Sequence, residues 1–483
     1  RAILWRFIKP AAYGEIKMKL KEVSEPVLFA DKFPHSTPPH ITFDEPFSEA
    51  LDGETFTIHP AEIRKRDIFI TDTTFRDGQQ ARPPYTKAQI LELFDLLSRL
   101  SGPHGVIRQT EFFLYSAKDR EVVETCRERG YRFPEITGWI RADSGDLGLV
   151  KQMGLMETGM LTSCSDYHIF MKLNLYRKKA FDNYTGLVKD ALAMGIRPRC
   201  HLEDITRADM DGFVLPYVEE LMRISESVDE KLKVKIRLCD TMGFGVSYPG
   251  AALPRSVPKI VLSMIHKAGV PPERLEWHGH NDFHKVLVNA TTAWIYGCNA
   301  LNASLIGIGE RCGNPPLEGA IIEYIGLKGG MCGIDTKIIT EIAHFYRSIG
   351  TRISVRYPFV GDDFHKTRAG IHADGLARDE RIYNIFDTAK LLDRPPEIVV
   401  TNQSGADGIH LWVNGFLGLC GKDRIKKTKM VKIMRWVSDQ YAVENRNTTI
   451  SDREMAQLVR EYLPEEYARA EAAGRVTYTH HEE

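Results

Sequence analysis

The 483-residue sequence has almost no net charge, no closely paired cysteines and no long apolar run. Lysine and arginine total 64 against 65 acidic residues, so the chain lacks the basic bias of nucleic-acid-binding and membrane-surface proteins. No run approaches the roughly 20 apolar residues that a membrane-spanning helix needs. These absences predict a globular protein with no nucleic-acid partner and no membrane partner.

The eight cysteines are scattered, and none forms a Cys-x-x-Cys pair. This spacing excludes a structural zinc finger and predicts reduced thiols in place of a disulfide framework. The first residues, Arg1-Ala2-Ile3-Leu4-Trp5, show neither the apolar core nor the cleavage site of a secretory signal. We therefore expect a cytoplasmic protein.

From Asp67 onward, short β-rich runs alternate with longer helical patterns such as 86–100 and 212–228. Eight such units across about 260 residues are what a (β/α)8 TIM barrel requires. A doubly wound open sheet is the rival interpretation, but no Gly-x-Gly-x-x-Gly motif follows the first strand. The predicted strands are 68–72, 107–112, 135–141, 157–163, 197–203, 234–239, 275–278 and 299–306.

The alternation stops near residue 326, and the pattern beyond it is mainly helical. Loops are expected around 355–372 and 393–408, and Ser451 with Glu454 predicts a capping box at the start of a helix. Residues 1–65 are expected to form an irregular arm, because the proline-rich segment 33–40 cannot be a regular helix or a central strand. The predicted organisation is an N-terminal extension (1–66), a catalytic TIM barrel (67–325) and a helical C-terminal region (326–483).

Polar residues stand at the ends of the predicted strands, which is where TIM barrels build their active sites. Arg76 and Asp77 follow the first strand, so a carboxylate that can hold a cation lies beside a guanidinium that can stabilise negative charge. His278 and His280 share one strand face, since side chains repeat every two residues. Two imidazoles and one carboxylate leave coordination positions open, as in a catalytic divalent-metal site. The alternative is that both histidines are ordinary polar core residues.

Several motifs occur in an order that resembles a known family. Together they resemble the DRE-type metallolyase superfamily of TIM barrels, over roughly residues 67–410. Segments 358–361 and 369–375 are similar to the branch that condenses acetyl-CoA with a 2-oxo acid, which includes 2-isopropylmalate, homocitrate and Re-citrate synthases. Gln79, Ala369 and Ala406 depart from the usual residues of the family. The motifs that carry the resemblance are Thr73-Thr74-Phe75-Arg76-Asp77-Gly78-Gln79-Gln80, Glu203-Asp204, Cys239-Asp240-Thr241-Met242-Gly243, His278-Gly279-His280-Asn281-Asp282 and Gly307-Ile308-Gly309-Glu310-Arg311-Cys312-Gly313-Asn314.

The resemblance implies a set of site residues and two small-molecule partners. Acetyl-CoA and a 2-oxo acid are the implied substrates, and a divalent ion (Mn²⁺, Mg²⁺, Co²⁺ or Zn²⁺) is the implied cofactor. A homodimer is implied as well, because the C-terminal segment of this branch completes the neighbouring subunit's site. The implied metal ligands are Asp77, His278, His280 and Asn314. The implied catalytic residues are Arg76, Glu203, His372 and Tyr383, and Thr241 is expected to bind the substrate carboxylate.

Arginines near the first three strands bear on the identity of the 2-oxo acid. Arg82 and Arg141, grouped with Glu111 as substrate-binding residues, favour an acceptor with a second carboxylate. Oxaloacetate and 2-oxoglutarate are then preferred over 2-oxoisovalerate. The sequence of residues 78–84 resembles the Re-citrate synthases more than the homocitrate synthases. The best interpretation is condensation of acetyl-CoA with oxaloacetate to give citrate. The alternatives are homocitrate synthesis, 2-isopropylmalate synthesis, an acyl-CoA lyase and an inactive scaffold.

Each assignment also has a purely structural alternative. Glu203 can pair with Arg76, and Thr241 can cap the following helix. Asp282 can orient a metal-binding histidine. Further alternatives are a solvated loop position for Arg82, a Glu310–Arg311 ion pair, and a polar core position for His168.

Overall fold

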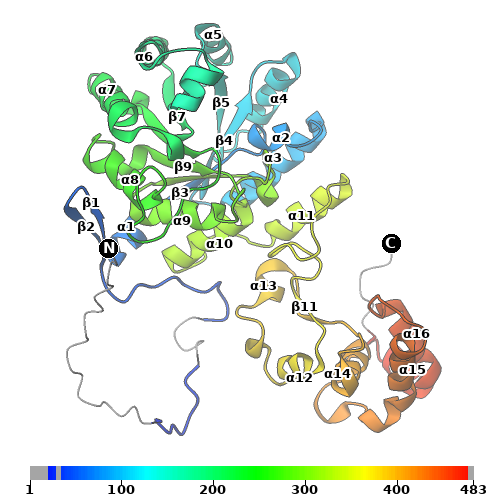
Figure 1. The fold of residues 1–483 in the computed structure, drawn as a ribbon. Coiled ribbons are helices and arrows are strands. Elements are labelled where there is room, and N and C mark those ends of the chain that lie inside the picture. The colour runs from blue at the N-terminus through cyan, green and yellow to red at the C-terminus, as the bar shows by residue number, and fades with distance from the viewer. Residues whose placement is uncertain (1–19, 29–33, 477–483) are drawn as a thin grey trace.

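The computed structural model describes residues 20–28 and 34–476, and its centre is a closed barrel of eight parallel strands (Figure 1). The hydrogen-bonded order β10-β3-β4-β5-β6-β7-β8-β9 returns to its starting strand, so the sheet has no free edge. This confirms the TIM barrel and excludes the open sheet. The strands are β3 (Phe69–Asp72), β4 (Ile107–Phe113), β5 (Glu135–Arg141), β6 (Glu157–Ser163), β7 (Arg197–Glu203), β8 (Lys235–Asp240), β9 (Leu275–Gly279) and β10 (Ala300–Ala303).

The first seven strands lie within one residue of their predicted bounds, but the eighth was predicted too long. It ends at Ala303, and the chain then makes a 3-10 turn over Leu305–Gly307. Ile306 has a φ of 55° in this turn, a conformation that no strand can contain. The turn redirects the chain toward the loop that carries Asn314.

Helices surround the barrel in Figure 1. Helix α3 covers the stretch that the helical pattern at 86–100 predicts, and Thr86 and Gln89 form a capping box at its start. The helix α7 is shorter than its predicted range of 212–228, because a π-helical turn over Met210–Val214 precedes it. The helices of the barrel layer are α3 (Lys87–Ser101), α4 (Ala117–Glu128), α5 (Ser144–Gln152), α6 (Arg177–Ala193), α7 (Leu215–Ser225), α8 (Val257–His266), α9 (Val286–Tyr296) and α10 (Leu317–Lys328).

Charged side chains fill much of the barrel interior, a place where branched apolar residues usually dominate. Arg199 on β7 donates to Glu111 on β4 at 3.0 Å and to Thr137 on β5 at 3.1 Å. It also lies 3.4 Å from Glu276 on β9, so its guanidinium reaches across the barrel. Lys235 on β8 donates to Glu157 on β6 at 2.9 Å. The interior is therefore held by opposite charges, and the carboxylates and cations compensate one another.

The N-terminal extension is more regular than the sequence analysis predicted. Strands β1 (Phe47–Leu51) and β2 (Glu54–Ile58) pair as an antiparallel hairpin, and α1 (Pro60–Lys65) follows. The turn is Asp52-Gly53, with φ values of 50° and 86°. An Asp-Gly pair between alternating apolar residues is a strong hairpin signal. The prediction of an irregular arm was therefore wrong at residues 47–58, and the sequence itself contained the signal for the hairpin. Residues 1–19 and 29–33 of the predicted arm lie outside the described residues.

The mainly helical C-terminal region predicted from residue 326 is confirmed. Val360, Phe386, Leu391 and Leu392 pack with the barrel core, and a second core extends from Val400 to Ala470. The domain limit at residue 325 stays a prediction. Ser451 and Glu454 form the predicted capping box. The helices are α11 (Ile338–Ser348), α12 (Gly370–Arg378), α13 (Thr388–Leu392), α14 (Gly405–Phe416), α15 (Val431–Ala442), α16 (Asp452–Tyr462) and α17 (Pro464–Ala472).

Within residues 20–28 and 34–476, no helix is both long enough and apolar enough to cross a lipid bilayer.

Candidate active site

Asp77, His278 and His280 meet at the carboxyl ends of two barrel strands. Asp77 opens the short helix α2 (Asp77–Gln80) just after β3, while His278 lies in β9 and His280 follows it. The Asp77 Oδ2 atom is 3.7 Å from His278 Nε2 and 3.9 Å from His280 Nε2, and the two Nε2 atoms are 3.3 Å apart. All three side chains are buried. One carboxylate oxygen and two imidazole nitrogens converge on a point that can hold a divalent cation.

Asn314 joins this cluster from the loop after β10. Its Nδ2 atom donates to Asp77 Oδ2 at 2.7 Å, and its buried Oδ1 has no hydrogen-bond partner among the described residues. Rotating the amide by half a turn directs that oxygen toward the Asp77 side, because amide O and N are interchangeable in shape. A Cβ atom on Gly309 would lie 1.5 Å from Asn314 Oδ1, so only glycine leaves room for this side chain.

The protonation states of the cluster suit a cation. Burial acts to raise the pKa of Asp77, but the positive charge of Arg76, the electrostatic effect of the two histidine rings and the hydrogen bond from Asn314 outweigh it and lower this pKa to about 2. Burial lowers the pKa of His278 to about 3, and burial also lowers the pKa of His280. Near neutral pH the cluster is therefore one carboxylate and two uncharged imidazoles, which are the forms that bind metals.

Arg76 is held beside this cluster by Glu111. The Nε atom of Arg76 donates to Glu111 Oε2 at 2.9 Å, and its Nη1 is 3.3 Å from Asp77 Oδ1. Arg237 and Arg199 also donate to Glu111, both at 3.0 Å. Burial acts to raise the pKa of Glu111, but these three guanidinium groups hold it well below its usual range. Glu111 is thus ionised near neutral pH and anchors Arg76.

Glu203 ends β7 and pairs with residues other than Arg76, so that structural alternative was wrong. Lys172 donates to both of its carboxylate oxygens, at 2.8 and 2.9 Å. Nδ1 of His168 lies 2.8 Å from its Oε2, and Ser163 donates to the same oxygen. Burial acts to raise the pKa of Glu203, but His168 and Lys172 lower it to about 2. This carboxylate is ionised near neutral pH, and the side chain of its partner Lys172 is 46% exposed.

Two further predictions at strand ends resolve into local contacts. The Thr241 hydroxyl accepts the backbone N–H of Asp204 at 2.8 Å, so it joins two strand ends and does not cap a helix. Arg311 Nε donates to Asp282 Oδ1 at 2.8 Å and its Nη2 donates to the carbonyl of Thr241. Arg311 therefore pairs with Asp282. The structural alternative of a Glu310–Arg311 ion pair was wrong.

The two arginines predicted to bind a second substrate carboxylate have other contacts here. Both guanidinium nitrogens that Arg141 uses, Nε and Nη2, donate to Asp146 at 3.1 Å, and Arg141 is exposed. The Arg82 guanidinium lies 3.9 Å from the ring centroid of Tyr85 and 5.8 Å from that of Tyr346. Neither makes a direct contact with Asp77 or the two histidines. Their role in substrate binding stays a prediction.

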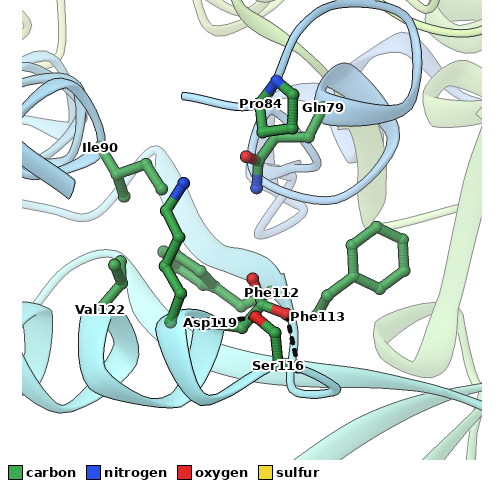
Figure 2. Close-up of a pocket in the computed structure, with 9 residues that line it drawn as sticks. Gln79, Pro84, Ile90, Phe112, Phe113, Ser116, Asp119 and Val122 are labelled. Carbon is green, nitrogen blue, oxygen red and sulfur yellow. Dashed lines mark hydrogen bonds between the residues drawn. The ribbon is translucent and has the colours of Figure 1, made fainter. Parts of the chain in front are cut away.

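Gln79, at the position where the family usually has glutamate, lines a small pocket beside β4. The pocket has a volume of about 220 Å³, and Figure 2 shows Gln79 and Pro84 opposite Phe112 and Phe113 of β4. The Gln79 amide donates to the carbonyl of Phe75 at 2.7 Å. It thereby stabilises the turn between β3 and α2.

His372 and Tyr383 are neighbours of each other but not of the barrel site. Their ring centroids are 4.5 Å apart, and both side chains are exposed. His372 belongs to α12, which lies well away from the barrel in Figure 1. Within one chain the structure therefore brings Arg76, Asp77, His278, His280 and Asn314 together and leaves this pair outside.

Several residues of the site region were missed by sequence reasoning. Asn302 on β10 contacts the ring of His278, and Lys172 neutralises Glu203. His201 on β7 is buried, and burial holds its pKa well below the usual range. Extending the two-residue alternation backward from Glu203 and His278 would have placed His201 and Glu276 on the same interior face.

The barrel and its carboxylate–imidazole cluster define a candidate metal-dependent enzyme of the TIM-barrel class. The HMGL-like family model matches residues 67–345, and the chain belongs to this family. The resemblance to the DRE-type metallolyases is thereby confirmed.

Three relatives are similar over most of this chain. The citrate (Re)-synthase of Syntrophus aciditrophicus is 54% identical over 452 residues, covering 93% of this chain and 70% of that protein. The citrate (Re)-synthase of Clostridium kluyveri is 49% identical over 450 residues, covering 92% and 96%. The 2-phosphinomethylmalate synthase of Streptomyces hygroscopicus is 34% identical over 431 residues, covering 88% and 94%.

Proposed function

We propose that this protein is a metal-dependent acyltransferase that condenses acetyl-CoA with oxaloacetate and water to give citrate and free CoA. The observation that carries the proposal is the 54% and 49% identity to two citrate (Re)-synthases, each over more than nine-tenths of the chain. In this reaction the methyl carbon of acetyl-CoA loses a proton and bonds to the ketone carbon of oxaloacetate. The new alkoxide takes up a proton, and water cleaves the thioester.

The residues at the strand ends fit a divalent ion. Asp77, His278 and His280 supply one oxygen and two nitrogens within 4.8 Å of one another, and Asn314 brings an unpaired buried oxygen. A divalent ion held there supplies a Lewis acid that polarises the ketone of a bound 2-oxo acid. The two neutral imidazoles and the ionised carboxylate each carry a lone pair, so the cluster loses no net proton when it binds a cation.

Arg76 is the proposed stabiliser of the negative charge that develops on the ketone oxygen. It is buried beside Asp77, and Glu111 fixes its direction through a 2.9 Å hydrogen bond. A fixed cation in a buried site stabilises an oxyanion more than a solvated one does, because the site does not need to reorganise.

Glu203 is the proposed base for the methyl proton, with His168 beside it. A carboxylate with a pKa near 2 is a weak base, and general bases work best when their pKa lies near the working pH. The Lys172 side chain that lowers this pKa is about half exposed, so a substrate that displaces it restores basicity to Glu203. The same carboxylate orients the His168 imidazole through a 2.8 Å contact.

His372 and Tyr383 are proposed to act in the site of a second copy of this chain. Both are exposed and lie away from their own barrel, and they are accompanied by the exposed apolar side chains Ile371, Ile382 and Ile385. Apolar groups gathered around two polar rings are the composition expected of a surface that docks on a partner. A homodimer in which each C-terminal region completes the other barrel satisfies both features.

The reaction is tested by measuring thiol release from acetyl-CoA with oxaloacetate, 2-oxoglutarate and 2-oxoisovalerate in the presence of Mn²⁺ or Mg²⁺. We expect oxaloacetate to be the preferred acceptor, with citrate as the product. Preference for 2-oxoglutarate would refute citrate synthesis in favour of homocitrate synthesis. Absence of thiol release with every acceptor would leave the scaffold interpretation.

The shared site is tested by mixing two inactive variants, Asp77→Asn and His372→Ala. If the site is built from two chains, a mixed dimer holds one intact site, and random pairing restores about a quarter of the wild-type sites. Mixtures that stay inactive after subunit exchange would show that each chain supplies its own His372. Native mass spectrometry of the mixture verifies that exchange has occurred.

A further inference from the structure

A continuous line of buried hydrogen bonds runs from the barrel interior to the ring of His278. Arg237 donates from Nε and Nη2 to the Glu276 carboxylate at 2.9 and 3.0 Å, and the Thr71 hydroxyl donates to Glu276 Oε1. Asn302 Nδ2 donates to Thr71 Oγ1 at 2.9 Å, and Asn302 Oδ1 lies 2.7 Å from His278 Nδ1. Every member of this line is at most 5% exposed, so water does not compete for these bonds.

The orientation of each group in the line is determined by its neighbours. Asn302 Nδ2 also lies 3.3 Å from the backbone carbonyl oxygen of Thr71, which can only accept. The amide nitrogen of Asn302 must therefore face Thr71, since the opposite orientation would set two acceptor oxygens against each other. Its Oδ1 consequently faces His278, and a carbonyl oxygen can only accept. The hydrogen of the His278 ring must then sit on Nδ1.

We propose that Asn302 is a positioning residue that holds His278 in the Nδ1–H tautomer. The lone pair of His278 Nε2 is then directed at the point between Asp77 Oδ2, 3.7 Å away, and the ring of His280. The inference deepens the proposed metal site and rests on it for its function, although the tautomer belongs to the chain without any ion. Metal-binding histidines generally donate their second ring N–H to a fixed acceptor, and such acceptors set the ring orientation.

The position of Asn302 in the barrel explains why an amide stands there. Strand β10 lies between β3 and β9, and Asn302 is directly opposite Thr71 in the β10–β3 ladder. An amide donates to Thr71 on one side and accepts from His278 on the other. A carboxylate would meet the Thr71 carbonyl with an oxygen and would add a second negative charge near Glu276. Asparagine, unlike aspartate, can form hydrogen bonds to both Thr71 and His278 without leaving a buried acceptor unpaired.

The tautomer is measured directly by ¹⁵N NMR of the metal-free, full-length protein labelled at histidine. The His278 signals are assigned by their absence in His278→Gln. We expect a protonated Nδ1 and an unprotonated Nε2 in the wild-type chain, and a mixture or reversal in Asn302→Ala. A wild-type ring protonated at Nε2 would overturn the inference, and so would an Asn302→Ala ring with the wild-type pattern. The wild-type measurement decides the question even if the variant fails to fold.

The consequence for the cation is measured by titrating the same proteins with Mn²⁺. Asn302→Ala should bind Mn²⁺ about 10–100-fold more weakly, as is usual when a group behind a metal ligand is removed. Thr71→Val should lose less, because Asn302 keeps the Thr71 carbonyl as a partner. An Asn302→Ala affinity within about twofold of wild type would contradict the inference.

Asn414→Ala is a matched control for the loss of a buried asparagine. Asn414 is 1% exposed in the C-terminal core, where it donates to the carbonyl of His410 and accepts from the N–H of Ile425 at 2.7 Å each. Its truncation should lower the melting temperature and leave Mn²⁺ affinity unchanged. An equal loss of affinity in both variants would assign the effect to general destabilisation. If the wild-type chain binds no Mn²⁺, the proposed metal site fails while the tautomer measurement remains valid.

Discussion

Replacing Glu111 with glutamine is expected to destabilise the barrel by about 3 kcal/mol, the lower end of the range for removing one partner from a buried ion pair. Glu111 accepts from Arg76, Arg199 and Arg237 at 2.9–3.0 Å, and its side chain is 1% exposed. The lower end applies because each guanidinium group keeps another carboxylate. Arg76 keeps Asp77 at 3.3 Å, and Arg237 keeps Glu276 at 2.9 Å. Arg199 keeps both Glu157 and Glu276 at 3.4 Å. At about 2–4 °C for each kcal/mol, the melting temperature should fall by roughly 6–12 °C.

The assay is thermal unfolding followed by near-ultraviolet circular dichroism, with Glu341→Gln as the control. Glu341 also makes two short hydrogen bonds to an arginine, Arg99, but on the surface, so its loss should move the melting temperature by less than about 2 °C. Because the pKa of Glu111 is depressed by folding, its contribution is complete above the unfolded value near 4.5 and shrinks as the pH falls below it. A Glu111→Gln melting temperature within about 2 °C of wild type at pH 7 would refute the view that this ion cluster holds the barrel.

Three further changes test the site itself. Gly309→Ala places a methyl group 1.5 Å from Asn314 Oδ1 and should weaken Mn²⁺ binding about tenfold by displacing Asn314, whereas an unchanged titration would show that Asn314 is dispensable. Glu203→Gln should lower kcat for thiol release by about 100-fold while Mn²⁺ affinity stays the same, and lost affinity would contradict its assignment as a base. Dialysis against a chelator should abolish wild-type activity and added Mn²⁺ should restore it, with Asp77→Asn showing no recovery; activity that survives dialysis would count against a metal-dependent reaction.

The strand positions were readable from local sequence because each β/α unit repeats the same alternation of a short β-branched run and an amphipathic helix. The strand ends were readable for the same reason, and they held Asp77, Glu203 and His278 at the predicted points. The hairpin at 47–58 was not predicted, although the Asp52-Gly53 pair is a typical hairpin turn. The eighth strand was predicted too long because Ile306 lies in an apolar run typical of a strand, and its residue type does not indicate the positive φ that it adopts.

The partners of the charged residues could not be read from the sequence, because they come from strands that are distant in the chain. Arg76 pairs with Glu111 and not with Glu203. Arg199 pairs with Glu111, Glu157 and Glu276, which lie on three other strands. Several arginines and carboxylates alternate on the interior face of the barrel, and any of them could have paired on the basis of residue type alone. Closure of the barrel selects the pairs by setting which strand faces which.

The sequence by itself determined the (β/α)8 barrel, the family and the residues of the proposed metal site, because periodicity and strand-end motifs are local properties of the chain. Only the tertiary structure decided which groups act on those residues. It placed Asn302 behind His278, Lys172 against Glu203 and Glu111 behind Arg76, contacts that span 24 to 35 residues. It also separated His372 and Tyr383 from their own barrel, since the direction in which the C-terminal region leaves the core depends on packing and not on any local pattern.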